Sequence, residues 1–256
     1  MNNHGIKIVV INLPTSVERR AYISRRLSDL GLSYSFFDAV NGKEGNDPGL
    51  FLYNNQKRLF EKGHSLTPGE QGCFASHRAI WELCVSENSN ILVLEDDVEL
   101  DDCLPAMLSN CEELLNSYHY IRLGRGTARR SLSFLRKWKV EDELNGEHSL
   151  VKYLRGPSCA HAYIITPISA KRFLSASQEW WWPVDDYMDM EYLNDQYNYG
   201  IEPPLVIQRG VVSDIGGVKK PKRTVPTRIR KEYFRLIDMI RRNIFNARYL
   251  ISKQQS

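Results

Sequence analysis

Ile91-Leu92-Val93-Leu94-Glu95-Asp96-Asp97 joins four consecutive apolar residues to three consecutive acids in a chain of 256 residues. An unbroken apolar run of this kind is typical of a central strand that is buried on both faces of a sheet. In open α/β sheets, ligands bind beyond the carboxyl ends of the strands. The stretch therefore predicts a buried strand that delivers a cluster of carboxylates to a ligand site.

The segments around this strand alternate between strand and helix patterns, which predicts an α/β fold with a mostly parallel central sheet flanked by helices. Thr67-Pro68-Gly69-Glu70 carries a further helix-start signature, a capping box with proline at the first helical position. The predicted strands are 6–13, 34–40, 91–94, 118–123 and 162–166. The predicted helices are 16–30, 67–84, 104–115, 167–176 and 228–251. The predicted loops are 41–64, 124–146 and 180–189.

Composition is that of a folded globular protein, with 42% hydrophobic and 25% charged residues. No stretch approaches the roughly 20 apolar residues of a membrane span, and the first residues lack a secretory-signal pattern. The five cysteines form no CxxC pair, so we expect free thiols in a reducing compartment rather than a zinc or redox motif. These features predict a cytoplasmic protein.

Charge is divided unevenly between two parts of the chain. Residues 216–256 hold 12 basic and 2 acidic side chains, a net charge of +10, and residues 1–215 then carry −7. We predict a catalytic domain over 1–215 and a basic loop with an amphipathic helix over 216–256. The helix, 228–251, either docks peripherally on the cytoplasmic face of an anionic membrane or packs on the acidic body of its own chain.

Three adjacent carboxylates repel one another, and a divalent cation is the natural partner that makes their crowding tolerable. Mn²⁺ or Mg²⁺ would share its coordination shell with phosphates. If the strand continues, Glu95 and Asp97 point the same way and could hold the metal, with Asp96 opposite. The alternative is an exposed acidic turn that caps the next helix.

Other polar side chains fall where a nucleotide pocket would lie. Asn12 and the pair Arg19-Arg20 follow the first strand, where the arginines could neutralise a diphosphate or simply form a solvated helix face. Ser76 and His77 lie in the capped helix, where they could line the pocket or be structural.

The segment from Trp180 to Met188 combines three tryptophans with two acids, Asp185 and Asp186. Aromatic faces stack on sugar rings and carboxylates bind their hydroxyls, whereas the alternative is a hydrophobic clamp. Either aspartate could act as a general base toward an acceptor hydroxyl.

Taken together and in order, several segments resemble family 25 of the glycosyltransferases, the group that contains bacterial lipooligosaccharide galactosyltransferases and collagen galactosyltransferases. The segments that carry the resemblance are Val10–Leu13, Glu18–Arg20, Phe36–Ala39, Leu66–Glu70, Gly72–His77 with Trp81, Leu94–Val98, Ala162–Ile165 and Pro183–Met188.

The resemblance implies a GT-A-type nucleotide-sugar-binding fold and a UDP-hexose donor, with UDP-galactose first and UDP-glucose or a UDP-N-acetylhexosamine as alternatives. Acceptors vary widely within the family, so the acceptor does not carry over from the resemblance; we expect a lipid-linked glycan acceptor and transfer that inverts the anomeric carbon. In this family the triplet corresponds to the metal and diphosphate motif, Asp185 to a further essential acid, and Gln208 to a late glutamine of the pattern. The donor-binding residues expected from both arguments are Asn12, Leu13, Arg19, Arg20, Ser76, His77, Asp96 and Gln208.

Competing function classes remain open at this point. A metal-dependent phosphohydrolase or nucleotidyltransferase also groups carboxylates after strands, and an inactive sugar-binding module would hold saccharide without turnover. Nucleic-acid binding is disfavoured, because the body is acidic and the basic tail is not interleaved with aromatics across a patch.

Overall fold

The computed structural model describes residues 5–126, 138–144, 147–210 and 224–254. Its main feature is an eight-stranded sheet in the order β2-β1-β3-β8-β5-β9-β7-β6. The strands are β1 (Ile6–Asn12), β2 (Tyr34–Asp38), β3 (Asn90–Glu95), β5 (Tyr120–Arg122), β6 (Trp138–Glu143), β7 (Ser149–Tyr153), β8 (Ala162–Ile165) and β9 (Tyr199–Glu202). A second, two-stranded sheet pairs β4 (Val98–Leu100) with β10 (Val206–Gln208).

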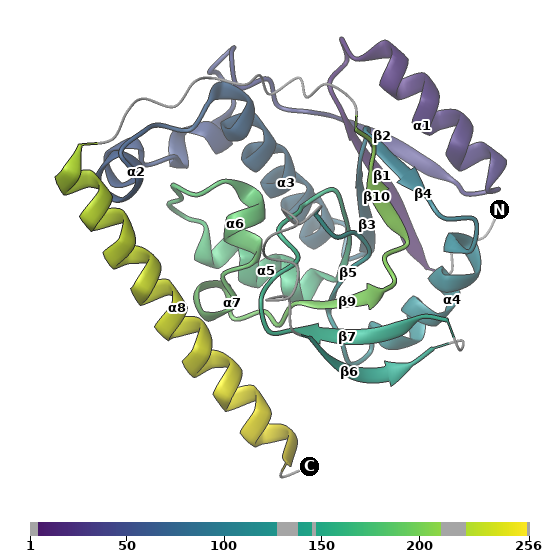
Figure 1. Ribbon diagram of the computed structural model, residues 1–256. Coiled ribbons are helices and arrows are strands. Elements are labelled where there is room, and N and C mark those ends of the chain that lie inside the picture. Colours follow the sequence, from purple (N-terminus) through teal and green to yellow (C-terminus); the bar gives the residue numbers. More distant parts are fainter. Residues whose placement is uncertain (1–4, 127–137, 145–146, 211–223, 255–256) are drawn as a thin grey trace.

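The helices occupy the spaces between the strands along the chain. They are α1 (Val17–Asp29), the 3-10 helix η1 (Pro48–Leu52), α2 (Asn55–Lys62), α3 (Pro68–Ser86), α4 (Leu104–Leu114), α5 (Pro167–Ala176), α6 (Val184–Met188), α7 (Glu191–Asn194) and α8 (Val225–Gln254). The predicted α/β class is confirmed, with a central sheet between helices and a C-terminal helix (Figure 1). The sheet is mixed: β1 pairs in parallel with β2 and β3, whereas β8 is antiparallel to β3.

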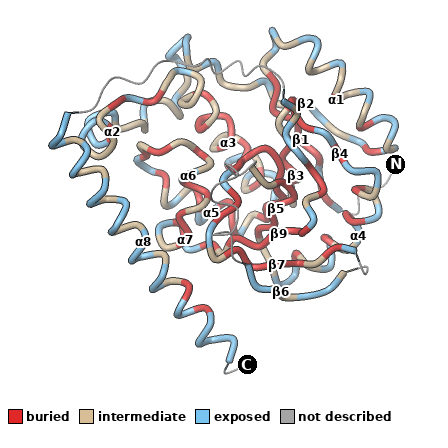
Figure 2. The backbone as a smooth tube through the Cα atoms, in the orientation of Figure 1, coloured by how far each residue is buried: buried red, intermediate tan, exposed pale blue. Residues whose placement is uncertain are grey.

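The core lies in two layers because the side chains of each strand alternate between the two faces of the sheet. On β1, Ile8 and Val10 pack into one hydrophobic cluster with Leu27 of α1 and Leu108 of α4. The intervening Val9 belongs to a second cluster on the other face, built with residues of α3 and α5. Figure 2 shows the central strands as the most buried part of the molecule. β3, the strand that ends in the acidic triplet, lies in the middle of this sheet and is therefore buried on both faces.

The start of α3 forms as the sequence predicts. The Thr67 hydroxyl accepts a hydrogen bond from the Glu70 amide, and the Glu70 carboxylate accepts one from the Thr67 amide. Such a cap stabilises a helix by about 1 kcal/mol. Close packing then brings residues 40–42 against this turn: a Cβ at Gly72 would lie 2.4 Å from the Val40 carbonyl oxygen, so only glycine fits.

Three segments predicted as loops are more regular than expected. The range 41–64 contains η1 and α2, 124–146 contains β6, and 180–189 contains α6. Local capping explains the helix within 41–64: the side chain of Asn54 accepts a hydrogen bond from the Lys57 amide, and Gly63 ends α2 in the left-handed conformation. We missed α2 because it lies at the periphery and shows no apolar stripe toward the core. Residues 127–137 and 145–146 of the second range, and residues 216–223 of the predicted basic loop, lie outside the described residues.

The predicted tail helix is confirmed as α8, which runs along one edge of the molecule (Figure 1). Among the described helices, α8 included, none is long and apolar enough to cross a membrane. All five cysteines are free thiols, as expected.

Candidate active site

A cavity of about 670 Å³ opens at the carboxyl ends of β1 and β3, beside the first turns of α3. A second cavity of about 430 Å³ adjoins it, and the two share Cys73, Glu95 and Gln208 as lining residues. The predicted site residues that line the first cavity are Leu13, Arg19, Ser76, His77, Glu95, Asp96, Asp97 and Gln208. Asp185 and Asp186 line the second.

The central strand ends at Glu95, so Asp96 and Asp97 lie in a turn rather than alternating along a continued strand. Asp96 turns toward β1 and α1. It accepts a hydrogen bond of 2.6 Å from the Asn12 side-chain amide and forms an ion pair of 3.3 Å with Arg19. Burial raises the pKa of Asp96, while Asn12 and Arg19 act to lower it. These partners hold the carboxylate in a fixed position at the cavity wall.

Asn12 and Arg20 support this arrangement and are not among the residues that line either cavity in the described part of the chain. Arg20 donates to Asn12 Oδ1 at 3.3 Å, pairs with Asp38 at 3.5 Å and lies over the Phe36 ring. The structure therefore places Arg20 behind Asn12, where it orients the amide that binds Asp96.

Asp97 turns the other way, toward the small sheet. Its Oδ2 accepts a hydrogen bond of 3.2 Å from Gln208, and its carbonyl oxygen accepts one from the Arg209 amide. Its Oδ1 is buried and accepts no hydrogen bond from any residue that the structure describes. Burial and the charge of Glu95 raise the pKa of Asp97. An unpaired buried carboxylate oxygen is costly, so Oδ1 is suited to a cation.

Glu95 is held by a chain of buried polar groups. The Trp81 indole donates to the Tyr163 hydroxyl at 3.0 Å, and we assign the O–H of Tyr163 as the donor to His77 Nδ1 at 2.8 Å. His77 then carries its proton on Nε2, which lies 3.5 Å from Glu95 Oε1. Burial acts to raise the pKa of Glu95, but His77, His161 and Arg19 together outweigh it, and the pKa lies below its ordinary value.

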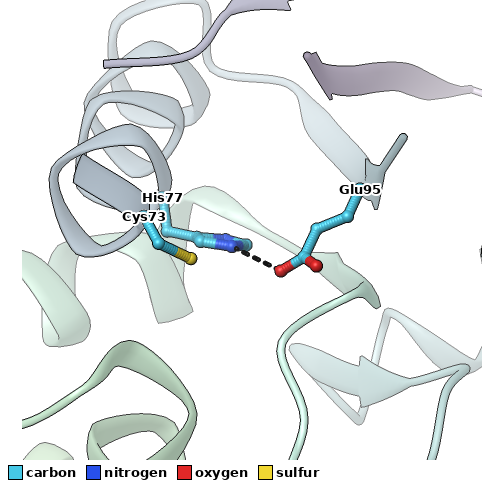
Figure 3. A group of neighbouring side chains, drawn as sticks. All are labelled: Cys73, His77 and Glu95. Carbon is cyan, nitrogen blue, oxygen red and sulfur yellow. Dashed lines mark hydrogen bonds and ion pairs between the residues drawn. The ribbon is translucent and has the colours of Figure 1, made fainter. Parts of the chain in front are cut away.

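Cys73 completes a group with these two residues. Cys73 and His77 come from adjacent turns of α3 and point toward Glu95 at the end of β3 (Figure 3). One potential ligand atom from each lies within 4.8 Å of the others. Burial, reinforced by the charge of Glu95, raises the pKa of the Cys73 thiol well above its ordinary value. A protonated thiol is a poor partner for Mn²⁺ or Mg²⁺, which prefer carboxylate oxygens.

Asp185 and Asp186 lie in the first turn of α6, and their surroundings differ. Burial, with the charge of Asp186 added, raises the pKa of Asp185 to about 6. Asp186 is the more exposed of the two; burial raises its pKa as well, but the cations Lys62 and Arg58 of α2 and Arg242 of α8 act to lower it. Asp185 is thus the member of the pair with an environment that favours the protonated acid near neutral pH.

The model of glycosyltransferase family 25, described as an LPS biosynthesis protein family, matches residues 5–188. The chain belongs to glycosyltransferase family 25. A family 25 member of Aedes aegypti is 31% identical over 199 residues, which cover 73% of this chain and 31% of that protein. The match to the lipooligosaccharide biosynthesis protein lex-1 of Haemophilus influenzae is 28% identical and covers 46% of this chain and 43% of lex-1.

A third relative is procollagen galactosyltransferase 1-A of Xenopus laevis, 32% identical over 129 residues, which are 46% of this chain and 21% of that protein. The chain matches about a third of the length of the insect relatives. The family match covers all the elements that build the first cavity except β10.

Within this family 25 chain, the tryptophans of 180–182 belong to the packing and not to a sugar platform. Trp180 is fully buried and stacks on Phe74 with ring centroids 4.0 Å apart. Trp181 stacks on the buried Trp182, and neither lines one of the two cavities. The hydrophobic-clamp alternative is therefore the one that the structure shows.

Ser76 also has a structural part in the site. Its hydroxyl donates to the Gly72 carbonyl and accepts from the Val40 amide, both at 2.8 Å, which ties residues 39–43 to α3. Backbone groups take both the donor and the acceptor role of this hydroxyl, so Ser76 shapes the cavity wall.

Cys73 and His161 are site residues that our sequence reasoning missed. His161 lines the second cavity, and its carbonyl accepts from the Glu95 amide at 2.9 Å. It reaches the site because β8 is antiparallel to β3, which sets the start of β8 beside the end of β3. Cys73 lies one helical turn before His77, a spacing that places both on one face.

Proposed function

We propose that this chain transfers a hexose from a UDP-hexose, with UDP-galactose as the donor, to a hydroxyl of a lipooligosaccharide or lipopolysaccharide glycan, and that the transfer inverts the anomeric carbon. The observation that carries the proposal is the pair of adjoining cavities, which share Glu95 between the acidic triplet and Asp185. A transferase needs such a pair because donor and acceptor must meet at one carbon. The names of the Xenopus and Haemophilus relatives support galactose and the glycan acceptor.

The first cavity suits the nucleotide donor. Glu95 and Asp97 fit a hard divalent cation, Mn²⁺ or Mg²⁺, since the neighbours of Glu95 favour its ionised form and Asp97 Oδ1 is buried without a partner in the described structure. When bound, the metal would neutralise charge on the diphosphate as the leaving group departs. Arg19, held at the cavity wall by Asp96, offers a second positive charge to the diphosphate.

The second cavity suits the acceptor. Asp185 would take the proton of the acceptor hydroxyl while the acceptor oxygen bonds to C1 of the sugar and the bond between C1 and the diphosphate oxygen breaks. Attack from the face opposite UDP inverts the configuration at C1. A carboxylate with a pKa of about 6 is a stronger base than an ordinary aspartate and is still ionised at pH 7.

The sharpest test compares Asp185→Asn with Asp186→Asn, which are adjacent and chemically identical changes. We expect Asp185→Asn to lower kcat by about 100- to 10,000-fold, the usual contribution of a general base, with UDP binding by calorimetry unchanged. Asp186 is exposed, so its variant should keep kcat within a few-fold. Near-normal turnover by Asp185→Asn would remove Asp185 from the mechanism.

A donor screen separates the proposed transfer from its alternatives. UDP-galactose, UDP-glucose and UDP-N-acetylhexosamines would each be incubated with and without a lipooligosaccharide acceptor, and UDP release measured. We expect acceptor-dependent release that is fastest with UDP-galactose. Equal release without acceptor would identify a hydrolase instead, and binding without any release would identify a sugar-binding module.

A further inference from the structure

The helix α8 packs on the body with one side only. On that side, the Phe234 ring meets Phe60 of α2 at 6.0 Å, and Asp238 accepts a hydrogen bond of 2.9 Å from Tyr192 of α7. Nearer the end of the helix, Asn246 donates to the Leu154 carbonyl at 2.7 Å, and Tyr249 is buried. Figure 2 shows the other side of the helix as exposed along most of its length. This attachment uses aromatic and polar side chains.

The apolar stripe of the helix therefore faces away from the body. Its members recur three, four or seven residues apart, so they share one face at 100° per residue. Their exposed fractions range from 47% to 67%. The stripe consists of Ile229, Tyr233, Leu236, Ile240, Ile244 and Ile251. Exposed apolar rows of this length mark an interaction surface rather than ordinary solvent-facing positions.

Exposed arginines lie beside and behind this stripe. At 100° per residue, Arg241 and Arg248 fall on one edge of it, and Arg228 and Arg235 fall farther round on the other side of the helix. The helix carries two acids. Asp238 is turned to Tyr192, whereas Glu232 pairs with Arg235 at 2.7 Å and offsets the charge of that arginine. An apolar stripe on a helix whose remaining exposed surface is rich in arginine is the pattern of a helix that lies in the headgroup region of an anionic bilayer.

We propose that the outer face of α8 docks this protein on anionic lipid, with the stripe of 229–251 inserted between headgroups and the flanking arginines paired with lipid phosphates. A second copy of the chain is a poorer occupant, since two such faces would bring arginines against arginines. Asp186 of α6, which lines the second cavity, faces Arg242 of α8, so the docked helix lies close to that cavity. The docking does not depend on turnover, so it can be tested without the proposed reaction.

The experiment measures co-sedimentation of the full chain with vesicles of phosphatidylcholine alone and with vesicles that also contain about 30% phosphatidylglycerol, whose anionic surface attracts basic segments. We expect binding to the anionic vesicles and loss of that binding in high salt. The variant Leu236→Ser/Ile240→Ser should bind at least about tenfold more weakly. Ile168→Ser on α5 is the matched control, because Ile168 is 48% exposed and Ile240 is 47% exposed.

A charge variant completes the test. Arg241→Gln/Arg248→Gln should weaken binding to anionic vesicles by about tenfold or more, because each arginine near such a surface contributes roughly fivefold. Lys171→Gln, exposed on α5, should have no effect. Equal sedimentation of all variants, or none on anionic vesicles, would overturn the proposal. So would a dimer in light scattering that the stripe variant dissociates, since the occupant would then be a second copy.

Discussion

The acidic triplet of 95–97 and the acidic pair of 185–186 are both crowded carboxylates at the rim of adjoining cavities, yet the protein treats them differently. Each acid of the triplet has its own polar partner: His77 for Glu95, Arg19 for Asp96 and Gln208 for Asp97. Burial raises the pKa of Asp96 and Asp97 too, but their hydrogen-bond donors act to lower it; at Asp185 the charge of Asp186 adds to burial, and the pKa rises to about 6.

The difference indicates two kinds of chemistry at one site. Partners that donate hydrogen bonds favour the ionised form of a carboxylate and fix its position, which suits binding of a cation and a diphosphate. A carboxylate that burial biases toward its protonated form suits acceptance of a proton. Glu95 lines both cavities and therefore stands where the two functions meet.

Removing a triplet acid should give the largest effect on UDP binding. We expect Asp97→Ala to weaken UDP binding in the presence of Mn²⁺ by more than about 100-fold, because it deletes the buried oxygen that fits the cation. Titration calorimetry with UDP, with and without Mn²⁺, measures it. Asp102→Ala is the control, since that side chain is 87% exposed. If Asp97→Ala binds UDP with Mn²⁺ as the unaltered chain does, the triplet does not hold the metal.

The raised pKa of Asp185 should show in the way turnover and stability depend on pH. Turnover should fall about tenfold per pH unit below pH 6 as Asp185 gains its proton, and activity above pH 7 should not depend on this group. Stability should change in the opposite direction. Because the pKa of Asp185 is raised from 3.8 to about 6, the native state binds more protons between these values. The free energy of unfolding therefore falls as pH rises through that window.

Asp185→Asn separates this contribution from those of other groups. It should raise the free energy of unfolding at pH 8, relative to pH 4, by at most about 3 kcal/mol, with solvent screening reducing the figure. Thermal unfolding of both proteins at the two pH values measures it. An acid limb near pH 4 in the rate profile, or no stability difference, would place the proton on another group.

Much of this comparison could be predicted from short stretches of sequence. The central strand, the triplet at its end and the capped helix follow from local patterns, because an apolar run and a capping box are readable within a few residues. The different partner of each acid in the triplet was not predictable, since it depends on β3 ending at Glu95 and on β10 placing Gln208 beside Asp97. His161 was missed because its position depends on an antiparallel pairing that no local pattern encodes.

The smallest expected effect concerns the group that orients Glu95. Tyr163→Phe removes the hydroxyl that accepts from Trp81 and donates to His77 Nδ1, which leaves buried groups unpaired at a cost of about 1–3 kcal/mol in stability. His77 can then place its proton on Nδ1, and its Nε2 no longer donates to Glu95. We expect metal-dependent UDP binding to weaken by about three- to tenfold, since outer partners of metal ligands contribute that order or more.

Nitrogen NMR of His77 distinguishes this effect from a general loosening of the packing around Tyr163: the Nε2-protonated tautomer should dominate in the unaltered chain and not in the variant. An unchanged tautomer with weakened binding would assign Tyr163 to packing alone.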